Sequence, residues 1–303
     1  MSTATATATP TPIPTPAGKG EPKELVAKMV KQVATLATLP EVTANIITTV
    51  EDPKSTAQAL HKIVAHDPAL VTRILKVVNS AFYGLPGQIA SIERAIVLLG
   101  LNAVKNIAVA ASLGQMFRGV QLCEGFTAKD LWQHCIAVAV TARELAKSLK
   151  IPVVDEAFLA GMIHDIGMLV ALQTAPDQLR TVCERVRTGA ATDFCATERE
   201  IMGVDHQMLG RALAEQWKFP NTCQLVAGFH HQPEGLSENN HILVWVVNAA
   251  DVLCAQGQKG FNLTALHQKL DEKGLAYVKI DTALIERTRN NLDELVKNAS
   301  PLL

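Results

Sequence analysis

The chain has 303 residues, of which 48% are hydrophobic but only 4% aromatic. This composition favours closely packed helices and disfavours a β-sandwich, whose strands are rich in aromatic and β-branched residues. The formal net charge of −1 gives no electrostatic reason to expect nucleic acid or an anionic membrane as a partner. The six cysteines are scattered and form no C-x-x-C pair, which predicts a reducing, cytoplasmic compartment.

Residues 1–20 form a Thr/Ala/Pro repeat that cannot bury apolar surface. We therefore expect a disordered tail. The repeat has neither the basic region nor the apolar region of a signal peptide. We also expect no membrane span, because no apolar run reaches roughly 18 residues.

Helix signals then follow one another as far as residue 118, where we expect the end of an N-terminal helical lobe (21–118). Capping patterns mark several helix starts: Ser55 with Gln58, Asp67 before Pro68, Ser91 and Asn102. The predicted helices are Glu24–Leu39, a helix through Val64, Ala69–Asn79, Ile92–Leu99 and Ala103–Phe117.

The pattern relaxes around Gly119–Gly125, where we place a boundary before a second lobe (126–303). Thr127 with Asp130 predicts the start of a long helix through Leu149. The later predicted elements are helices at Asp155–Leu172, Asp177–Arg187, Asp193–Met202, His206–Trp217, Cys223–Phe229, Ile242–Cys254 and Thr282–Lys297, with a segment at Leu263–Leu270. The sequence thus predicts an all-α protein of two lobes.

Five histidines and two aspartates of the second lobe lie at positions that predict burial. Consecutive helical residues point about 100° apart, so His164 and Asp165 reach one cavity only from the edge of a buried face. Gly161 and Gly167 on either side would allow close approach of a helix or a ligand. The complete set is His134, His164, Asp165, His206, His230, His231 and Asp251.

Two interpretations of this set are open from the residues alone. A single inward histidine is more often a hydrogen-bonded core residue than a metal ligand. Asp251, however, lies in an otherwise apolar helix, and an unpaired buried carboxylate is costly. A divalent metal would satisfy all seven groups, since imidazole and carboxylate suit Fe, Mn, Zn or Co.

The order of these residues resembles the motif set of the HD superfamily of metal-dependent phosphohydrolases, and the HD-GYP branch in particular. The segments Asn79–Gly84 and Ile92–Gly100, after Leu39-Pro40, resemble the HDOD domain. The resemblance covers about Leu25 to Asp251. HDOD domains are typically regulatory modules in bacterial signalling, and many of them lack some of the metal ligands.

This resemblance implies a two-metal site. One metal would bind His134, His164, Asp165 and Asp251, and the other His206, His230 and His231, with Asp165 bridging the two. Two departures argue against hydrolysis. Met168 stands where HD-GYP enzymes usually carry a lysine, and Gln232–Leu236 contains no Gly-Tyr-Pro loop.

Our leading hypothesis is a signalling module that binds metal and a partner protein or nucleotide. The alternatives are a metal-dependent phosphohydrolase acting on a nucleotide or cyclic dinucleotide, and a metal- or redox-responsive sensor. Lys76, Arg94 and Lys105 could line a phosphate-binding groove or simply lie on solvated helix faces. The apolar face of Thr282–Lys297 could form a homodimer or pack back on the second lobe.

Overall fold

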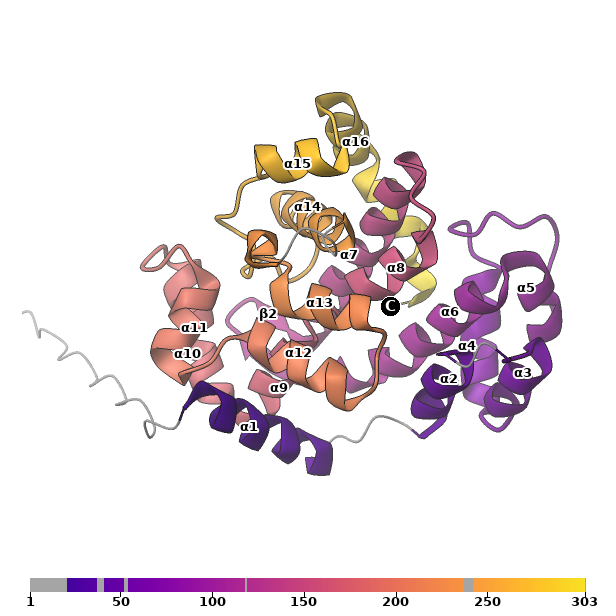
Figure 1. Cartoon of the computed structure of the whole chain (residues 1–303), viewed down its shortest axis with the longest axis horizontal. Helices are drawn as coiled ribbons and strands as arrows, with labels where there is room; N and C mark the ends of the chain where they lie inside the picture. Colours follow the sequence, from indigo (N-terminus) through magenta and orange to yellow (C-terminus); the bar gives the residue numbers. More distant parts are fainter. Residues whose placement is uncertain (1–20, 37–40, 52–53, 118, 237–241, 303) are drawn as a thin grey trace, which may run out of the picture.

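A computed structural model describes residues 21–36, 41–51, 54–117, 119–236 and 242–302. Within these ranges the regular structure is helical apart from one short hairpin, which confirms the all-α prediction (Figure 1). The predicted tail at residues 1–20 and the Leu39-Pro40 motif lie outside the described residues.

The N-terminal part contains a compact group of helices around α6, whose middle is buried on all sides. Helix α6 packs against α2, α4 and α5, and α3 completes the group. The bounds are α1 (Pro22–Leu36), α2 (Glu41–Glu51), α3 (Ala57–Ala65), α4 (Pro68–Val78), α5 (Ile92–Leu99) and α6 (Leu101–Leu113).

The second part is built around the long helix α7, which packs against α8, α14 and α16. A short antiparallel hairpin precedes α7 in the chain; its strands are β1 (Gln121–Cys123) and β2 (Phe126–Thr127). The hairpin follows the 3-10 turn η1 (Gly114–Phe117). The remaining bounds are α7 (Ala128–Ser148), α8 (Val154–Ile163), α9 (Ile166–Thr174), α10 (Pro176–Arg187), α11 (Phe194–Met202), α12 (His206–Gln216), α13 (Asn221–Phe229), η2 (Pro233–Gly235), α14 (Ile242–Gln256), α15 (Glu272–Val278), α16 (Thr282–Asn298) and η3 (Ser300–Leu302).

The two predicted lobes exchange elements at both ends. Helix α1, which the prediction groups with residues 21–118, packs instead against α9 and α12 of the second lobe (Figure 1). In the other direction, η3 near the C-terminus packs on α4. The indole of Trp132 holds it there by donating to the Leu302 carbonyl at 3.0 Å. These contacts join the two predicted lobes, and the boundary between the lobes stays a prediction.

Local capping signals were mostly sufficient to place the helix starts. Thr127 and Asp130 form the expected reciprocal capping box, and Asp67 and Ser91 cap α4 and α5. Two predicted caps are wrong. Thr56, one residue after Ser55, accepts from the Ala59 amide, and α6 begins at Leu101 after Gly100, without a side-chain cap from Asn102.

The predicted helix Asp155–Leu172 is interrupted at His164-Asp165, which is the main correction to the predicted elements. Helix α8 ends at Ile163 and α9 begins at Ile166. Asp165 between them has φ −95° and ψ 19°, outside the helical region. The break frees two adjacent side chains from the 100° separation of a continuous helix, so that both reach the same cavity.

Two glycines bring neighbouring helices close to this break. A methyl group on Gly161 would lie 2.9 Å from the Cα of Ala139 in α7. One on Gly167 would lie 1.8 Å from the carbonyl oxygen of His206, at the start of α12. The absence of a side chain at these positions allows α7 and α12 to present their histidines to the same point.

The apolar stretch Val154–Thr174 is long and apolar enough to span a membrane, but 89% of its most apolar 18-residue window is buried inside the protein. It is the central segment of the helical core. Helix α16 packs against α7 with Leu284 and Leu292 buried, which accounts for its apolar face. A homodimer through this helix stays a prediction.

Candidate metal centre

Seven side chains converge in the core of the second lobe. They come from the middle of α7 (His134), the α8–α9 break (His164 and Asp165), the start of α12 (His206), the end of α13 (His230 and His231) and α14 (Asp251). Six of these residues have no exposed surface, and the side chain of His231 is 2% exposed. The structure therefore brings together every metal ligand that the sequence predicts.

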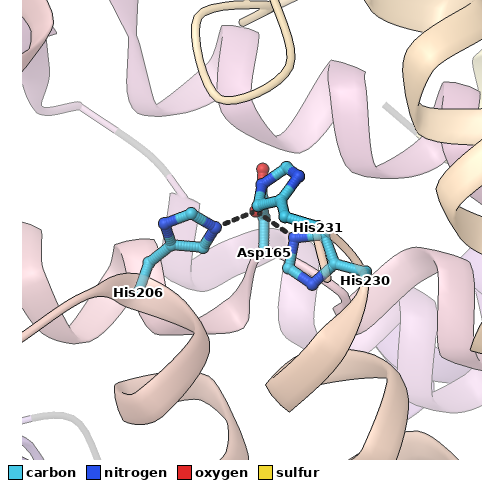
Figure 2. Close-up of side chains that lie close together, drawn as sticks. All are labelled: Asp165, His206, His230 and His231. Carbon is cyan, nitrogen blue, oxygen red and sulfur yellow. Dashed lines mark ion pairs between the residues drawn. The ribbon is translucent and has the colours of Figure 1, made fainter. Parts of the chain in front are cut away.

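Asp165 lies at the centre of the cluster. Its Oδ1 atom is 3.3 Å from Nε2 of His206 and 3.3 Å from Nε2 of His230, as the dashed lines in Figure 2 show. Its Oδ2 atom lies 3.4 Å from Nε2 of His164 and accepts a 3.3 Å hydrogen bond from the Thr264 hydroxyl. One carboxylate thus faces histidines from both sides.

Asp251 occupies the other side of the cluster. Its Oδ1 atom lies 2.9 Å from Nε2 of His134 and 3.9 Å from Nε2 of His164. Its Oδ2 atom lies 3.6 Å from Nδ1 of His231. The two aspartates therefore share His164 between them.

Four of the five imidazoles are oriented by a hydrogen bond at Nδ1. When Nδ1 carries the proton and donates it, the Nε2 lone pair is free for a metal, an arrangement typical of metal-binding histidines. The four acceptors are the Lys259 carbonyl for His134 (3.0 Å), the Gly161 carbonyl for His164 (2.7 Å), the Val226 carbonyl for His230 (3.0 Å) and the Glu198 carboxylate for His206 (2.6 Å).

Glu198 is the functional residue that our sequence analysis missed. Its side chain is fully buried, and the same oxygen that contacts Nδ1 of His206 also accepts from the His206 backbone amide at 3.0 Å. A signal was present in the sequence. Phe194, Glu198 and Met202 recur at four-residue spacing, which places the carboxylate on the buried face of α11.

Many buried polar atoms of the cluster have no hydrogen-bond partner among the described residues. They are Nε2 of His164, His206 and His230, both ring nitrogens of His231, Oδ1 of Asp165 and Oδ2 of Asp251. Buried polar atoms without partners are rare and costly in folded proteins. Converging unpaired nitrogen and carboxylate atoms fit a divalent metal.

Three overlapping ligand sets of the cluster satisfy the distance requirement for a metal, each with all ligand atoms within 4.8 Å of one another. The first contains Asp165, His206, His230 and His231, the second contains His134, His164 and Asp165, and the third contains His164, His230 and Asp251. Asp165 belongs to the first two. These residues could hold a metal, in agreement with the predicted site.

A fourth set, Cys195, Glu198 and His206, is less suited to a metal. Burial raises the pKa of the Cys195 thiol well above its ordinary value, so the thiol stays protonated. Glu198 is already engaged with Nδ1 of His206. We therefore infer that Glu198 orients His206 and that this set does not form a separate metal site.

The histidines of the cluster have opposite titration behaviour. Burial lowers the pKa of His230 to about 4. Burial also lowers the pKa of His206, but the Glu198 carboxylate outweighs this effect and raises it to about 9. Asp165 is buried, yet the neighbouring His164 keeps its pKa well below the ordinary value. Near neutral pH, the cluster holds an ionised carboxylate beside a protonated and a neutral imidazole.

The structure places the predicted phosphate contacts in three different surroundings. Lys76 is exposed on α4 and lines a cavity of about 180 Å³ with Arg73 and Trp132. Arg94 is exposed on α5, and Lys105 is 8% exposed on α6. None of these three residues belongs to the histidine–aspartate cluster, so their role as phosphate contacts stays a prediction. Met168 is fully buried in α9.

Several solved structures share this fold. One is a protein of Shewanella amazonensis SB2B, provisionally named a phosphohydrolase, with a TM-score of 0.72, 26% identity, and coverage of 91% of this chain and 98% of that one. A Geobacter sulfurreducens HDOD domain protein of unknown function gives a TM-score of 0.70 at 21% identity, with 90% and 99% of the two chains covered.

A sequence relative is an uncharacterized protein of Treponema pallidum (strain Nichols), 24% identical over 230 residues. The match covers 76% of this chain and 44% of the relative, so the chain spans less than half the length of that curated protein. Residues 36–233 match the family model of the HDOD domain. This match covers more than half of the sequence, and the chain therefore belongs to the HDOD domain family.

Proposed function

We propose that this protein is a cytoplasmic signalling module that binds a dinuclear metal centre and, through it, a nucleotide or a partner protein. The observation that carries the proposal is the complete ligand set. All seven predicted ligands converge, and six of them, all but His134, carry a buried polar atom without a hydrogen-bond partner among the described residues. A core without metal would leave these groups unsatisfied at considerable cost.

The position of Asp165 supports two metals rather than one. Its carboxylate belongs to two of the ligand sets, and its two oxygens face different histidines. One metal would bind His134, His164, Asp165 and Asp251, and the second His206, His230 and His231, with Asp165 shared. A bridging carboxylate is a common way to hold two cations close together.

One feature favours a binding role over hydrolysis. The buried thioether of Met168 occupies the position where the HD-GYP resemblance expects a lysine. The α9 position therefore lacks a cation that could bind a transferred phosphate.

The second candidate is a metal-dependent phosphohydrolase acting on a nucleotide or cyclic dinucleotide. It is favoured by the filled ligand set and by the provisional name of the Shewanella relative. When two metals are bound in such a site, they supply Lewis-acid stabilisation of the phosphate. This chain would contribute the positioning of the ligands by Nδ1 hydrogen bonds and the exclusion of water by the surrounding helices.

An anaerobic assay separates the two candidates. Protein loaded with Mn or Fe is incubated with mononucleotides and cyclic dinucleotides, and both ligand binding and product formation are measured. The signalling proposal expects binding without sustained turnover. Robust turnover that is abolished by Asp165→Ala would overturn it in favour of the hydrolase.

A further inference from the structure

Two of the six cysteines lie together outside the metal cluster. Cys123 ends β1, Cys183 lies on the buried face of α10, and β1 packs directly against α10. Both side chains are buried free thiols, close enough to hydrogen-bond to each other. The fold therefore brings into contact two thiols that are far apart in the sequence.

An arginine ties the two chain segments together beside these thiols. Arg187 lies one helical turn after Cys183. Its guanidinium contacts the carboxylates of Glu124 and Glu184, each at 2.8 Å. Glu124 directly follows Cys123 in the chain, and Glu184 likewise follows the second cysteine. Because both glutamates are exposed, the thiol pair lies immediately beneath the surface.

The two thiols differ in acidity. The hydrogen bond from Cys183 lowers the pKa of Cys123, although burial and the Glu184 carboxylate oppose this effect. The guanidinium groups of Arg187 and Arg180 lower the same pKa further. The hydrogen bond and burial together raise the pKa of Cys183 well above its ordinary value. Since the thiolate is the reactive form, Cys123 is the nucleophile of the pair and Cys183 keeps its proton.

We propose that Cys123 and Cys183 form a redox-responsive pair, which a hydroperoxide converts to a disulfide, with Arg187 holding the pair and supporting the Cys123 thiolate. The inference goes beyond the proposed function and does not depend on it, because neither cysteine is among the seven metal ligands. Disulfides of proteins in reducing compartments are usually transient and catalytic or redox-sensing.

The reaction has two steps, and the oxidant is the hydroperoxide. The Cys123 sulfur attacks one peroxide oxygen, so that an S–O bond forms, the O–O bond breaks and the leaving oxygen takes up a proton as alcohol or water. The Cys183 sulfur then attacks the resulting sulfenic acid. An S–S bond forms, the S–O bond breaks, and the hydroxyl leaves with the Cys183 proton as water. The two sulfurs together lose two electrons, which the peroxide gains.

The test is oxidation of the full-length protein with stoichiometric hydrogen peroxide, in the presence of a chelator that removes free metal. The protein is then denatured, alkylated and digested, and the peptides are analysed by mass spectrometry without reduction. The peptides of Cys123 and Cys183 should be cross-linked, and dithiothreitol should reverse the link. Recovery of both as alkylated thiols, or cross-links of either to another cysteine, would overturn the proposal.

The assigned roles predict different products for the two single variants. In Cys183→Ser the sulfenic acid on Cys123 has no partner thiol, so dimedone should trap it. In Cys123→Ser the remaining thiol stays protonated and should give no dimedone adduct. An adduct on Cys183 but not on Cys123 would overturn the assignment of the nucleophile. The cross-link in the wild type tests the pair even if a variant fails to fold.

A matched pair of variants on α10 tests the arginine. Arg187→Gln should slow formation of the disulfide about threefold or more, because the thiolate loses its neighbouring cation. Arg185→Gln is the control, since Arg185 is about equally exposed but pairs with Glu200 instead. Equal rates for the two variants would overturn the role given to Arg187.

Discussion

One oxygen of Glu198 contacts both the Nδ1 atom of His206, at 2.6 Å, and the backbone amide of the same residue, at 3.0 Å. This double contact fixes the imidazole at the start of α12 and directs Nε2 toward Asp165. Carboxylate–histidine pairs of this kind raise the basicity of a metal ligand and hold its orientation.

We predict that Glu198→Ala weakens metal binding by about 10–100-fold, the range typical when such a supporting group is removed. Glu200→Ala is the control, because this carboxylate lies on the same helix but is exposed and pairs with Arg185 at 2.8 Å. Competition with a chromogenic chelator measures both affinities. Equal affinities for Glu198→Ala and the wild type would contradict the role assigned to Glu198.

Metal uptake at neutral pH should release about one proton from His206. Its pKa is raised to about 9, so Nε2 is protonated at pH 7.5 and must lose that proton before it binds a metal. His230, with a pKa of about 4, is already neutral and releases none. The affinity should therefore rise as the pH increases from 7 toward 9 and then level off.

Calorimetry in buffers of different ionisation enthalpy measures this proton release. The binding heat should depend on the buffer at pH 7.5 and lose most of that dependence at pH 9.5. Heats that are independent of the buffer at pH 7.5 would show that His206 is not the proton source.

The close approach of α9 and α12 predicts an intolerance to side chains at Gly167. A methyl group there would lie 1.8 Å from the His206 carbonyl oxygen and 2.6 Å from the Gly210 amide nitrogen. Both are backbone atoms, which cannot rotate away as a side chain can. We expect Gly167→Ala to lower the free energy of unfolding by about 3 kcal/mol or more. Metal binding should weaken as well, because α12 carries His206.

Urea unfolding of Gly167→Ala is best compared with Gly235→Ala. The added methyl at Gly235 would make only ordinary contact, at 3.5 Å, with the Phe229 ring. If the two variants unfold at the same urea concentration, the helix contact at Gly167 is not as tight as the structure shows.

The His231 ring should contribute to the thermal stability of the metal-bound protein but not to that of the metal-free protein. Both of its ring nitrogens are buried without a partner, so replacing the ring with an apolar side chain removes an unfavourable feature. We expect His231→Leu to leave the metal-free Tm unchanged or higher. The increase in Tm on adding metal should shrink, because one ligand is missing.

Thermal melts with and without metal test this prediction, with His267→Leu as an exposed control. A full metal-dependent increase in Tm for His231→Leu would show that this ring is not a ligand.

Most of the caps could be read from the sequence because they depend on local residue types, and the seven candidate ligands followed from the resemblance of their order to the HD motif set. The break at His164-Asp165 could not. The segment around it is buried on every side, so its apolar residues show no periodicity that would reveal an interruption. It contains no proline, and the break is stabilised by packing against α7 and α12, which are distant in sequence.

Other differences have similar causes. Helix α2 (Glu41–Glu51) was not predicted, and its position beside α6 is set by tertiary packing. The segment Leu263–Leu270 contains turns and irregular chain but no helix, and α15 follows it. Its residue Thr264 donates to Asp165, so this irregular segment forms part of the support of the cluster. Propensity alone does not identify such a contact.

The most direct test of the central claim is the metal-to-protein ratio, measured by elemental analysis of purified protein. The wild type, reconstituted anaerobically, should contain two metal ions per chain. Asp165→Ala should lose most of both, because its carboxylate belongs to two of the ligand sets. A stoichiometric metal content that neither Asp165→Ala nor His164→Ala changes would contradict the assignment of this cluster as the metal centre.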